Sequence, residues 1–254
     1  ERRYLKGQRD SDSELPSVVF FTCIRSASQY IDGIISRLYG AAGGNVVNLP
    51  NYCFHGSPQR SAELRDPEKM RDLLRPTGFY YGALRPFGYL PDPSEYRVVA
   101  VVRDPRDIIV SFFYSLAYAH TPLDEKFIAD ARDDKEKGIE WFVLQPERLE
   151  MVREPLKFYR DEVWGKEGCF CWLYEDMMAD FASFCTELEQ HVTGGAAASE
   201  RDAIIAQNAA QSAPKAGENL LSHRRSGRSG EFRKKLEPET SDIATRTSNF
   251  FILS

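Results

Sequence analysis

Apolar residues along this chain fall into short runs, and the first run sets a pattern that recurs. Val18–Phe21 is continuously apolar and is followed by a polar stretch at Thr22–Ser28. Beyond that stretch, apolar positions are spaced by three and four residues, which places their side chains on one face of a helix. We therefore predict a buried strand, a loop and an amphipathic helix whose core-facing residues are Ile31, Ile34, Ile35 and Leu38.

The same order of strand, loop and helix is predicted twice more. Val98–Val102 is rich in β-branched residues, as in a parallel strand covered on both faces, and a turn at Arg103–Pro105 precedes a helical pattern. Cys169–Leu173 is a third apolar run, which Tyr174–Asp176 ends before a helix at Met177–His191. Three strands that each feed a helix predict an α/β fold with a doubly wound parallel sheet, in which ligands bind at the carboxyl ends of the strands. The loops after these strands contain Arg25, Arg103 and Tyr174.

Weaker patterns fill the remainder of the chain. Its 254 residues, of which 42% are hydrophobic, are enough for one large α/β domain or for two smaller ones. We assign residues 17–254 to one domain and residues 1–16 to a polar, loosely held lead-in. Further elements are expected as short strands at Val46–Leu49 and Phe79–Leu84 and as helices at Pro67–Leu74, Asp124–Arg160 and Ser199–Gln207.

The net charge of −5 argues against a general nucleic-acid binder. The sequence has no run of about 18 apolar residues and no signal-like start, so we expect a cytoplasmic protein that does not span a membrane. Because the sequence begins at Glu1 rather than at Met, an upstream targeting or membrane segment stays an open alternative.

The five cysteines favour packing over chemistry. Their number is odd and they lack the paired CxxC spacing of a zinc site, so we predict no metal and a reduced protein with buried thiols. Cys169 and Cys171 are two residues apart in an apolar run. They are expected on one face of a strand, where packing is the favoured role.

The loop after the first predicted strand has the features of an anion site. It lies where a strand feeds a helix, and the first N–H groups of a helix carry the positive end of its dipole. Arg25, Ser26 and Ser28 add a guanidinium and two hydroxyl groups. The glycines of a P-loop, GxxxxGKS or GxxxxGKT, are missing, which disfavours a nucleotide kinase of that class. An ordinary strand–turn–helix unit with an incidental Arg25 stays an alternative.

A basic segment punctuated by glycine runs from His223 to Lys234. Glycine permits close approach of the backbone to a ligand, so this segment suits a lid over an anion. The alternative is a solvated basic loop.

Four segments, taken in chain order, resemble the motifs of the sulfotransferases that use 3′-phosphoadenosine 5′-phosphosulfate (PAPS). TCIRSASQY at Thr22–Tyr30 is similar to that family's 5′-phosphosulfate loop, TYPKSGTTW. RDPRDIIVSFFY at Arg103–Tyr114 is similar to its 3′-phosphate strand and helix, Tyr174–Asp176 to its YED motif, and Arg225–Arg233 to its RKGxxGDWK segment. The resemblance implies a P-loop-kinase-like sulfotransferase fold: a single domain with a central parallel sheet flanked by helices.

The resemblance also implies which residues bind PAPS. The 5′-phosphosulfate and the 3′-phosphate need two separated anion sites, and arginine donates two parallel hydrogen bonds to phosphate. Tyr30 stands where the family stacks an aromatic ring on the adenine, and Tyr174 where another ring lines the purine pocket; core packing is the alternative for both. The residues implied for the 5′ side are Arg25, Ser26, Ala27, Ser28, Gln29 and Tyr30, and those for the 3′ side are Arg103, Ser111, Arg225, Ser226 and Gly227.

The implied reaction moves the sulfuryl group from PAPS to a hydroxyl or amine of a small-molecule acceptor and releases 3′-phosphoadenosine 5′-phosphate (PAP), without a metal. Arg25 takes the place of the family's usual Lys. It would act on the departing oxygen electrostatically, because arginine does not give up a proton at neutral pH. The expected partner is the acceptor, not a nucleic acid or a membrane, and a homodimer stays an open alternative.

The sequence departs from the family at the proton acceptor. Cytosolic sulfotransferases carry a His in a THLP segment, and the matching residue here is Leu84, which cannot accept a proton. Ala27, Ser226 and Phe232 also replace a Gly, a Lys and a Trp of the family's motifs. A catalytically degenerate PAPS- or PAP-binding protein is therefore the second hypothesis.

Two histidines compete for the role of catalytic base. His55 follows the second short strand, and His120 follows the predicted helix that contains Ser111. An imidazole titrates near neutral pH and can take a hydroxyl proton. We favour His55, and a surface or packing histidine is the alternative for each.

Overall fold

The computed structural model describes residues 2–50, 66–84, 90–119, 125–211 and 229–248. Contacts within the chain divide it into two units. The first unit comprises Glu1–Cys23, Ala27–Val102 and Phe158–Ala213, and the second comprises Ile24–Ser26, Arg103–Lys157 and Pro214–Ser254.

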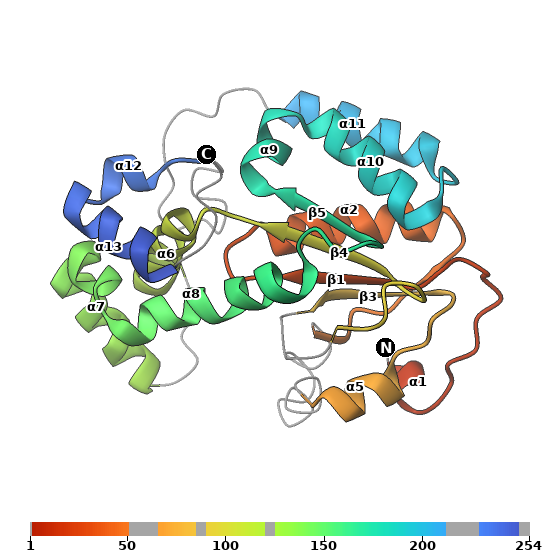
Figure 1. Cartoon of the computed structure of the whole chain (residues 1–254), viewed down its shortest axis with the longest axis horizontal. Helices are drawn as coiled ribbons and strands as arrows, with labels where there is room; N and C mark the ends of the chain where they lie inside the picture. Colours follow the sequence, from red (N-terminus) through yellow and green to blue (C-terminus); the bar gives the residue numbers. More distant parts are fainter. Residues whose placement is uncertain (1, 51–65, 85–89, 120–124, 212–228, 249–254) are drawn as a thin grey trace. The chain divides into compact units, whose positions relative to one another are not determined.

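The first unit is built on a five-stranded parallel sheet, which confirms the predicted α/β class (Figure 1). The two-residue β2 is shorter than the predicted strand Val46–Leu49, because pairing with β3 ends at Val46. The strands are β1 (Val18–Thr22), β2 (Asn45–Val46), β3 (Phe79–Leu84), β4 (Arg97–Val102) and β5 (Cys169–Leu173), in the spatial order β2-β3-β1-β4-β5.

Helices cover both faces of this sheet, which is why its central strands are continuously apolar. On one face, Val18 and Phe20 join a buried cluster with residues of α2 (Ser28–Ala41), α10 (Phe181–Thr193) and α11 (Ala198–Gln211). On the other face, the ring of Phe21 lies 5.7 Å from that of Phe158, just before the π-helix η2 (Tyr159–Val163). The predicted core positions of α2, namely Ile31, Ile34, Ile35 and Leu38, are all buried.

The topology places the ends of β1 and β4 at one edge of the sheet. The central strand β1 pairs with β3 on one side and with β4 on the other. After β1 the chain builds β2 and β3, and it then crosses to β4, so the direction of winding reverses between these strands. Thr22 pairs with Val101, so the loops that follow β1 and β4 start side by side. Such a reversal at the carboxyl ends is where open parallel sheets bind ligands.

Two predicted helices are interrupted. The segment predicted as one helix from Met177 to His191 forms α9 (Tyr174–Ala179) and α10, because Asp180 leaves the helical conformation and accepts a 3.0 Å hydrogen bond from the backbone N–H of Ser183 as an N-cap. The predicted helical stretch Asp124–Arg160 forms several elements. Its first helix kinks at Gly138, where φ is 83°, a value that favours glycine.

The second unit is helical in its described part. Helix α6 packs against α7, α12 and α13, and the π-helix η1 continues directly from α6. The elements of this unit are α6 (Pro105–Tyr114), η1 (Ser115–Ala119), α7 (Glu125–Val143), most of α8 (Pro146–Phe158), α12 (Phe232–Lys235) and α13 (Pro238–Ser248).

The lead-in is tied to the first unit rather than loosely held. Its helix α1 (Arg2–Leu5) buries Tyr4, whose hydroxyl donates to the carbonyl of Leu73 and lies 2.8 Å from the hydroxyl of Tyr81. Leu73 ends helix α5 (Pro67–Leu73). The prediction of a loosely held lead-in rested on the hydrophilic composition of residues 1–16 and overlooked Tyr4, the one aromatic residue in this segment.

The described cysteines are Cys23, Cys169, Cys171 and Cys185, and all four are free thiols. Burial raises the pKa of Cys171 to about 11 and that of Cys185 to about 12. Both groups therefore stay protonated at neutral pH, which supports the packing role predicted for the cysteine pair of β5.

His191 is a half-buried residue of α10 that packs against the sheet. Its Nε2 lies 3.0 Å from the backbone carbonyl of Val98 on β4, and its ring lies against Phe170 on β5. Burial lowers the pKa of His191 from 6.5 to about 4. The folded protein therefore holds this imidazole neutral at pH values where the unfolded chain protonates it.

We expect acid to destabilise the fold through His191. Above pH 6.5 both states carry a neutral imidazole; as the pH falls from 6.5 to 4, only the unfolded state takes up the proton. The free energy of unfolding should fall by about 3 kcal/mol across this window. Denaturant unfolding of the wild type and of His191→Gln, which replaces the imidazole by a non-titrating side chain that has an N–H donor, measures the difference. Parallel curves between pH 4 and 6.5 would contradict the assignment.

Candidate functional site

The loop between β1 and α2 has an unusual backbone for its sequence. Arg25 and Ala27 have φ values of 63° and 58°, in the left-handed region that glycine usually occupies. Each such conformation costs an L-residue about 1–2 kcal/mol. Left-handed residues in a turn aim successive N–H groups into one concavity that suits an anion. Ala27 is also the N-cap of α2 and has no side-chain oxygen to accept from the first N–H groups of that helix.

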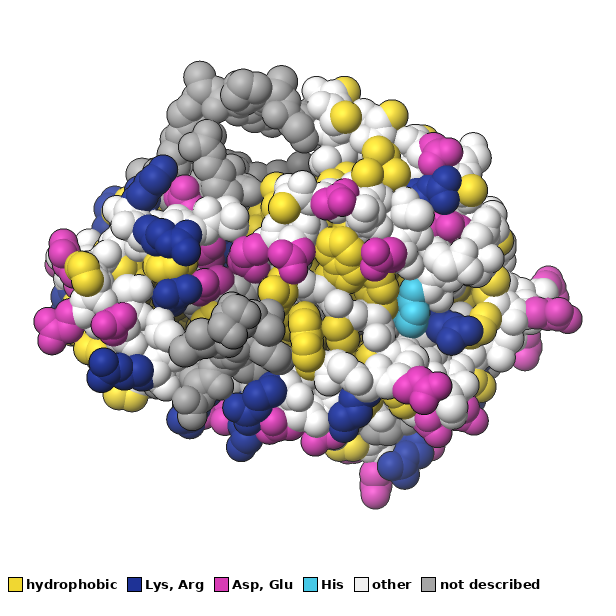
Figure 2. All heavy atoms as spheres, turned by 45° about the horizontal axis from the view of Figure 1, so that its top comes forward, with side chains coloured by type: hydrophobic (Ala, Val, Ile, Leu, Met, Phe, Trp, Pro, Cys, Tyr) yellow, Lys and Arg dark blue, Asp and Glu magenta, His cyan; other side chains and the backbone are white. Residues whose placement is uncertain are grey.

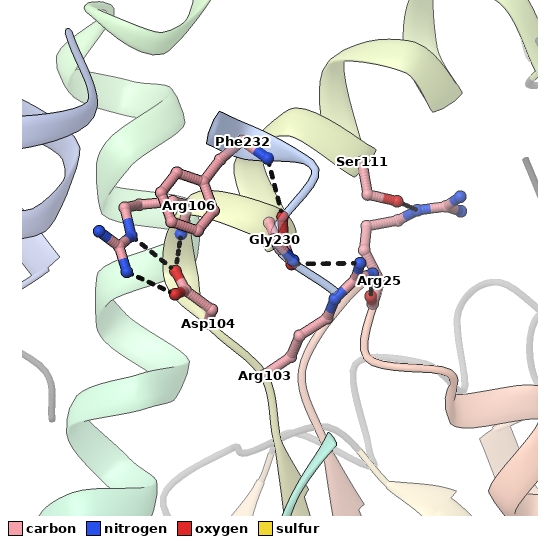
Figure 3. Close-up of polar contacts among 8 residues, drawn as sticks. Arg25, Arg103, Asp104, Arg106, Ser111, Gly230 and Phe232 are labelled. Atoms are coloured by element: carbon pink, nitrogen blue, oxygen red, sulfur yellow. Dashed lines mark hydrogen bonds and ion pairs between the residues drawn. The ribbon is translucent and has the colours of Figure 1, made fainter. Parts of the chain in front are cut away.

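Three of the predicted site residues meet in the second unit (Figure 3). Nε of Arg25 donates to Oγ of Ser111 on α6 over 3.2 Å. Nη1 of Arg103, the residue that follows β4, donates to the backbone carbonyl of Arg25 over 3.0 Å. The structure thus brings two guanidinium groups and a hydroxyl together, although the sequence assigned Arg25 to the 5′ side of the nucleotide and the other two residues to the 3′ side.

A buried carboxylate that the sequence interpretation missed organises this cluster. The side chain of Asp107 is fully buried, and its Oδ2 lies 3.7 Å from Nη2 of Arg103 one helical turn away. Both oxygens also accept backbone hydrogen bonds from the C-terminal segment: Oδ2 from the N–H of Gly230 over 2.7 Å and Oδ1 from that of Phe232 over 3.1 Å. Asp107 therefore orients Arg103 and fastens the end of the glycine-punctuated segment to α6.

A second ion pair supports the start of α6. Asp104 caps this helix by accepting from the N–H of Arg106, and its carboxylate accepts two further hydrogen bonds from the guanidinium of Arg106 over 3.0 and 2.7 Å. These bonds raise the pKa of Arg106. The same guanidinium lies 3.8 Å from the ring centre of Phe232 (Figure 3). The guanidinium of Arg233 lies 4.9 Å from that ring centre. Phe232, which replaces the family's Trp, is thus held by two cations.

The remaining described residues of the predicted nucleotide site differ in exposure to solvent and in their contacts. Ser26 is buried, Ser28 is half-buried at the first turn of α2, and Gln29 is exposed. The hydroxyl of Tyr30 donates to Oδ1 of Asn208 over 2.8 Å, and its ring lies 5.9 Å from that of Phe181. Tyr174 is 5% exposed and belongs to the core cluster of the first unit.

Several predicted site residues lie outside the described residues. They are the two candidate bases, His55 and His120, and the three residues of the basic segment assigned to the 3′ side, Arg225, Ser226 and Gly227. Leu84, which stands where the family carries its histidine, is the last residue of β3 and is 1% exposed.

Charge is distributed without a dominant sign over the face drawn in Figure 2, where Lys and Arg side chains lie among Asp and Glu. Within the described residues, no helix is long and apolar enough to cross a membrane. In the same part of the chain, no three His, Cys, Asp or Glu side chains group as metal ligands would.

The side chains that meet in the second unit form a set of anion donors. Arg25 and Arg103 supply forked guanidinium groups, and Ser111 supplies a hydroxyl. Planar guanidinium forks match phosphate oxygens in pairs. The chemistry of these residues is therefore suited to phosphate or phosphosulfate oxygens.

A comparison with known protein families identifies a family for this chain. The family model described as the sulfotransferase domain matches residues 85–248, which is more than half of the chain. No curated protein matches the sequence.

Among solved structures, the chain is similar to a mouse sulfotransferase complexed with PAP. The two share 16% identity with a TM-score of 0.52, over 98% of this chain and 91% of the mouse protein. A retinol dehydratase complexed with androsterone and the inactive cofactor PAP also has 16% identity, with a TM-score of 0.47, over 98% of this chain and 84% of that one. The sheet and its helices thus form the P-loop-kinase-like fold of sulfotransferases. With its family model matched over residues 85–248, the chain belongs to the sulfotransferase domain family.

Proposed function

We propose that this protein transfers the sulfuryl group from PAPS to a hydroxyl or amine of a small-molecule acceptor and releases PAP. The observation that carries this proposal is the cluster of Arg25, Arg103 and Ser111, which follows the carboxyl ends of β1 and β4. Membership of the sulfotransferase domain family supports this proposal, and so does the PAP bound to the structurally similar mouse sulfotransferase.

In this proposal Arg25 stabilises the charge that develops on the departing oxygen of PAP. Sulfuryl transfer needs in-line positioning and positive charge at the leaving oxygen, and a preorganised donor supplies both without a proton transfer. Arg103 and Ser111 hold the 3′-phosphate, with Arg225, Ser226 and Gly227 as further candidates. The contact between Arg25 and Ser111 would then join the 5′ and 3′ ends of the nucleotide site.

Tyr30 and Tyr174 are proposed to border the adenine. Tyr30 is half-buried, so part of its ring is accessible to a ligand. Tyr174 is 5% exposed, which favours a supporting role in the wall over stacking. Ser26, Ala27, Ser28 and Gln29 complete the loop at the 5′ end.

We expect PAP to stabilise the protein. A ligand at a hundred times its dissociation constant adds about 2.7 kcal/mol to the free energy of unfolding, or roughly 5–10 °C in the midpoint of thermal unfolding for a chain of this size. Thermal unfolding with and without saturating PAP is the measurement. An unchanged midpoint would contradict nucleotide binding.

The substitution Arg103→Ala tests whether Arg103 binds the 3′-phosphate of the nucleotide. It should weaken PAP and PAPS while barely changing the affinity for adenosine 5′-phosphosulfate, which lacks the 3′-phosphate. An equal loss for both kinds of nucleotide would show that Arg103 does not bind the 3′-phosphate.

Leu84 favours a second candidate, a PAP- or PAPS-binding protein without turnover. This buried hydrocarbon side chain cannot accept the acceptor's proton. Sulfate transfer from labelled PAPS to phenols, sterols, amines and sugars separates the two functions.

The same assay on His55→Ala and His120→Ala tests which histidine is the catalytic base, because loss of a general base lowers the rate about 10²–10⁴-fold.

A further inference from the structure

A stripe of polar side chains runs along helix α6 and into η1. Asp107, Ser111 and Ser115 are spaced by four residues, so they lie on one face of the helix in successive turns. Between them the helix buries Ile108, Ile109, Val110 and Phe113. All three members of the stripe belong to the second unit.

The first two members of the stripe are committed to the candidate nucleotide site. Asp107 holds Arg103 and the backbone at Gly230, and Ser111 accepts from Arg25. Each contact links α6 to Arg25, to Arg103 or to the C-terminal segment, all within the second unit. Two successive turns of α6 thus each contribute one side chain to the candidate nucleotide site.

Ser115 differs from the other two members. The residue is 2% exposed, and its Oγ has no hydrogen-bond partner in the part of the chain that the structure describes. Its backbone N–H donates to the carbonyls of Phe112 and Ser111. A buried hydroxyl without a partner is costly and uncommon, and it calls for an explanation.

The backbone conformation at Ser115 is of a kind that is common at functional sites. The π-helix η1 begins at this residue. Single π-helical turns are rare and frequently occur at functional sites. Four residues of helix advance about 6 Å, so Ser115 lies one turn beyond the residue that contacts Arg25. In the proposed function Arg25 meets the departing oxygen of PAP, so an acceptor placed beside Arg25 needs to extend by only about one helical turn to reach Ser115.

We propose that the Ser115 hydroxyl binds a second oxygen-bearing group of the acceptor, an inference that rests on the proposed function. A hydroxyl both donates and accepts, so it pairs with a neutral hydroxyl, carbonyl or ether. It cannot neutralise a charge, which would be costly to bury beside it. The favoured acceptors are therefore neutral dihydroxy and polyhydroxy compounds rather than simple alcohols or phenols.

The test compares acceptors that differ by one hydroxyl group. Phenol is paired with catechol, resorcinol and hydroquinone, and cyclohexanol with the corresponding cyclohexanediols, so that several oxygen spacings are sampled. Binding to the protein–PAP complex is measured by calorimetry, and transfer from PAPS is followed with the same compounds. At least one dihydroxy compound should bind the wild type about 10-fold more tightly than its monohydroxy partner.

Ser115→Ala should abolish that preference and leave the affinity for the monohydroxy compound and for PAP unchanged. Because the serine hydroxyl has no partner among the residues that the structure describes, the variant's melting temperature should equal or exceed that of the wild type. Ser241→Ala, on α13 of the same unit, is the matched control and should keep the preference.

The inference would be overturned by a wild type without preference in any pair, by a Ser115→Ala variant that keeps the preference, or by a marked fall in the melting temperature of that variant. A wild type that binds none of these acceptors would overturn it as well. Failure of the proposed function has a separate signature, because PAP would then neither bind nor raise the melting temperature.

Discussion

Asp107→Ala is expected to lower the free energy of unfolding of the second unit by about 3–5 kcal/mol. The substitution leaves Arg103 without its buried carboxylate and deprives the N–H groups of Gly230 and Phe232 of their acceptor. Loss of one partner from a buried ionic network is costly because the other partners stay buried. Denaturant unfolding, with limited proteolysis of the C-terminal segment as a second readout, measures the effect.

Asp104→Ala is the matched control, since both residues belong to the segment RDPRD. Asp104 caps α6 and pairs with Arg106, but about a fifth of its side chain is accessible to solvent (21%). Loss of such a cap costs about 1 kcal/mol. Equal destabilisation by the two substitutions would contradict the central role assigned to Asp107.

Arg25→Ala is expected to lower kcat for sulfuryl transfer by about 10²–10³-fold, as removal of one preorganised donor does in other enzymes. The substitution keeps a non-glycine residue at a position whose φ is 63°, so the backbone strain of the loop is unchanged. Turnover of labelled PAPS, together with PAP affinity, is the measurement. The loss should be larger in kcat than in nucleotide affinity, because the departing oxygen gains charge only during the reaction.

Two further variants make the Arg25 result specific. Arg25→Lys keeps the charge and should recover part of the rate. Arg37→Ala removes an exposed arginine of α2 that pairs with Glu200, a kind of contact that contributes about 0–1 kcal/mol, and it should leave kcat unchanged. A rate for Arg25→Ala close to that of the wild type would exclude Arg25 from the chemistry.

The strand–loop–helix units were predictable because burial on both faces leaves a continuous apolar run. β1, β4 and β5 lie where Val18–Phe21, Val98–Val102 and Cys169–Leu173 predicted them. The spatial order of the strands was not predictable, since it depends on which edges pair in three dimensions. The break at Asp180 was missed because its capping bond to Ser183 is a local contact inside an apolar periodicity that continues through it.

The candidate site was predictable to the extent that its residues belong to motifs. Arg25, Arg103 and Ser111 were singled out on the sequence and lie together in the structure. Asp107 was missed because its most important partners are backbone N–H groups, which have no sequence signature. Its spacing of four residues from Arg103 was the one available signal. Ser115 was missed because a hydroxyl without a partner is visible only in a folded chain.

The attachment of the C-terminal segment to Asp107 also has a consequence for the order of events during synthesis. The two N–H groups that this carboxylate needs lie 123 and 125 residues further along the chain. At about 5–20 residues per second, they leave the ribosome roughly 6–25 s after Asp107 itself. The nascent chain can assemble its sheet long before then, but it cannot bury Asp107 with a complete set of partners. The guanidinium of Arg103, which Asp107 orients, therefore reaches its final position only after Gly230 and Phe232 have been made.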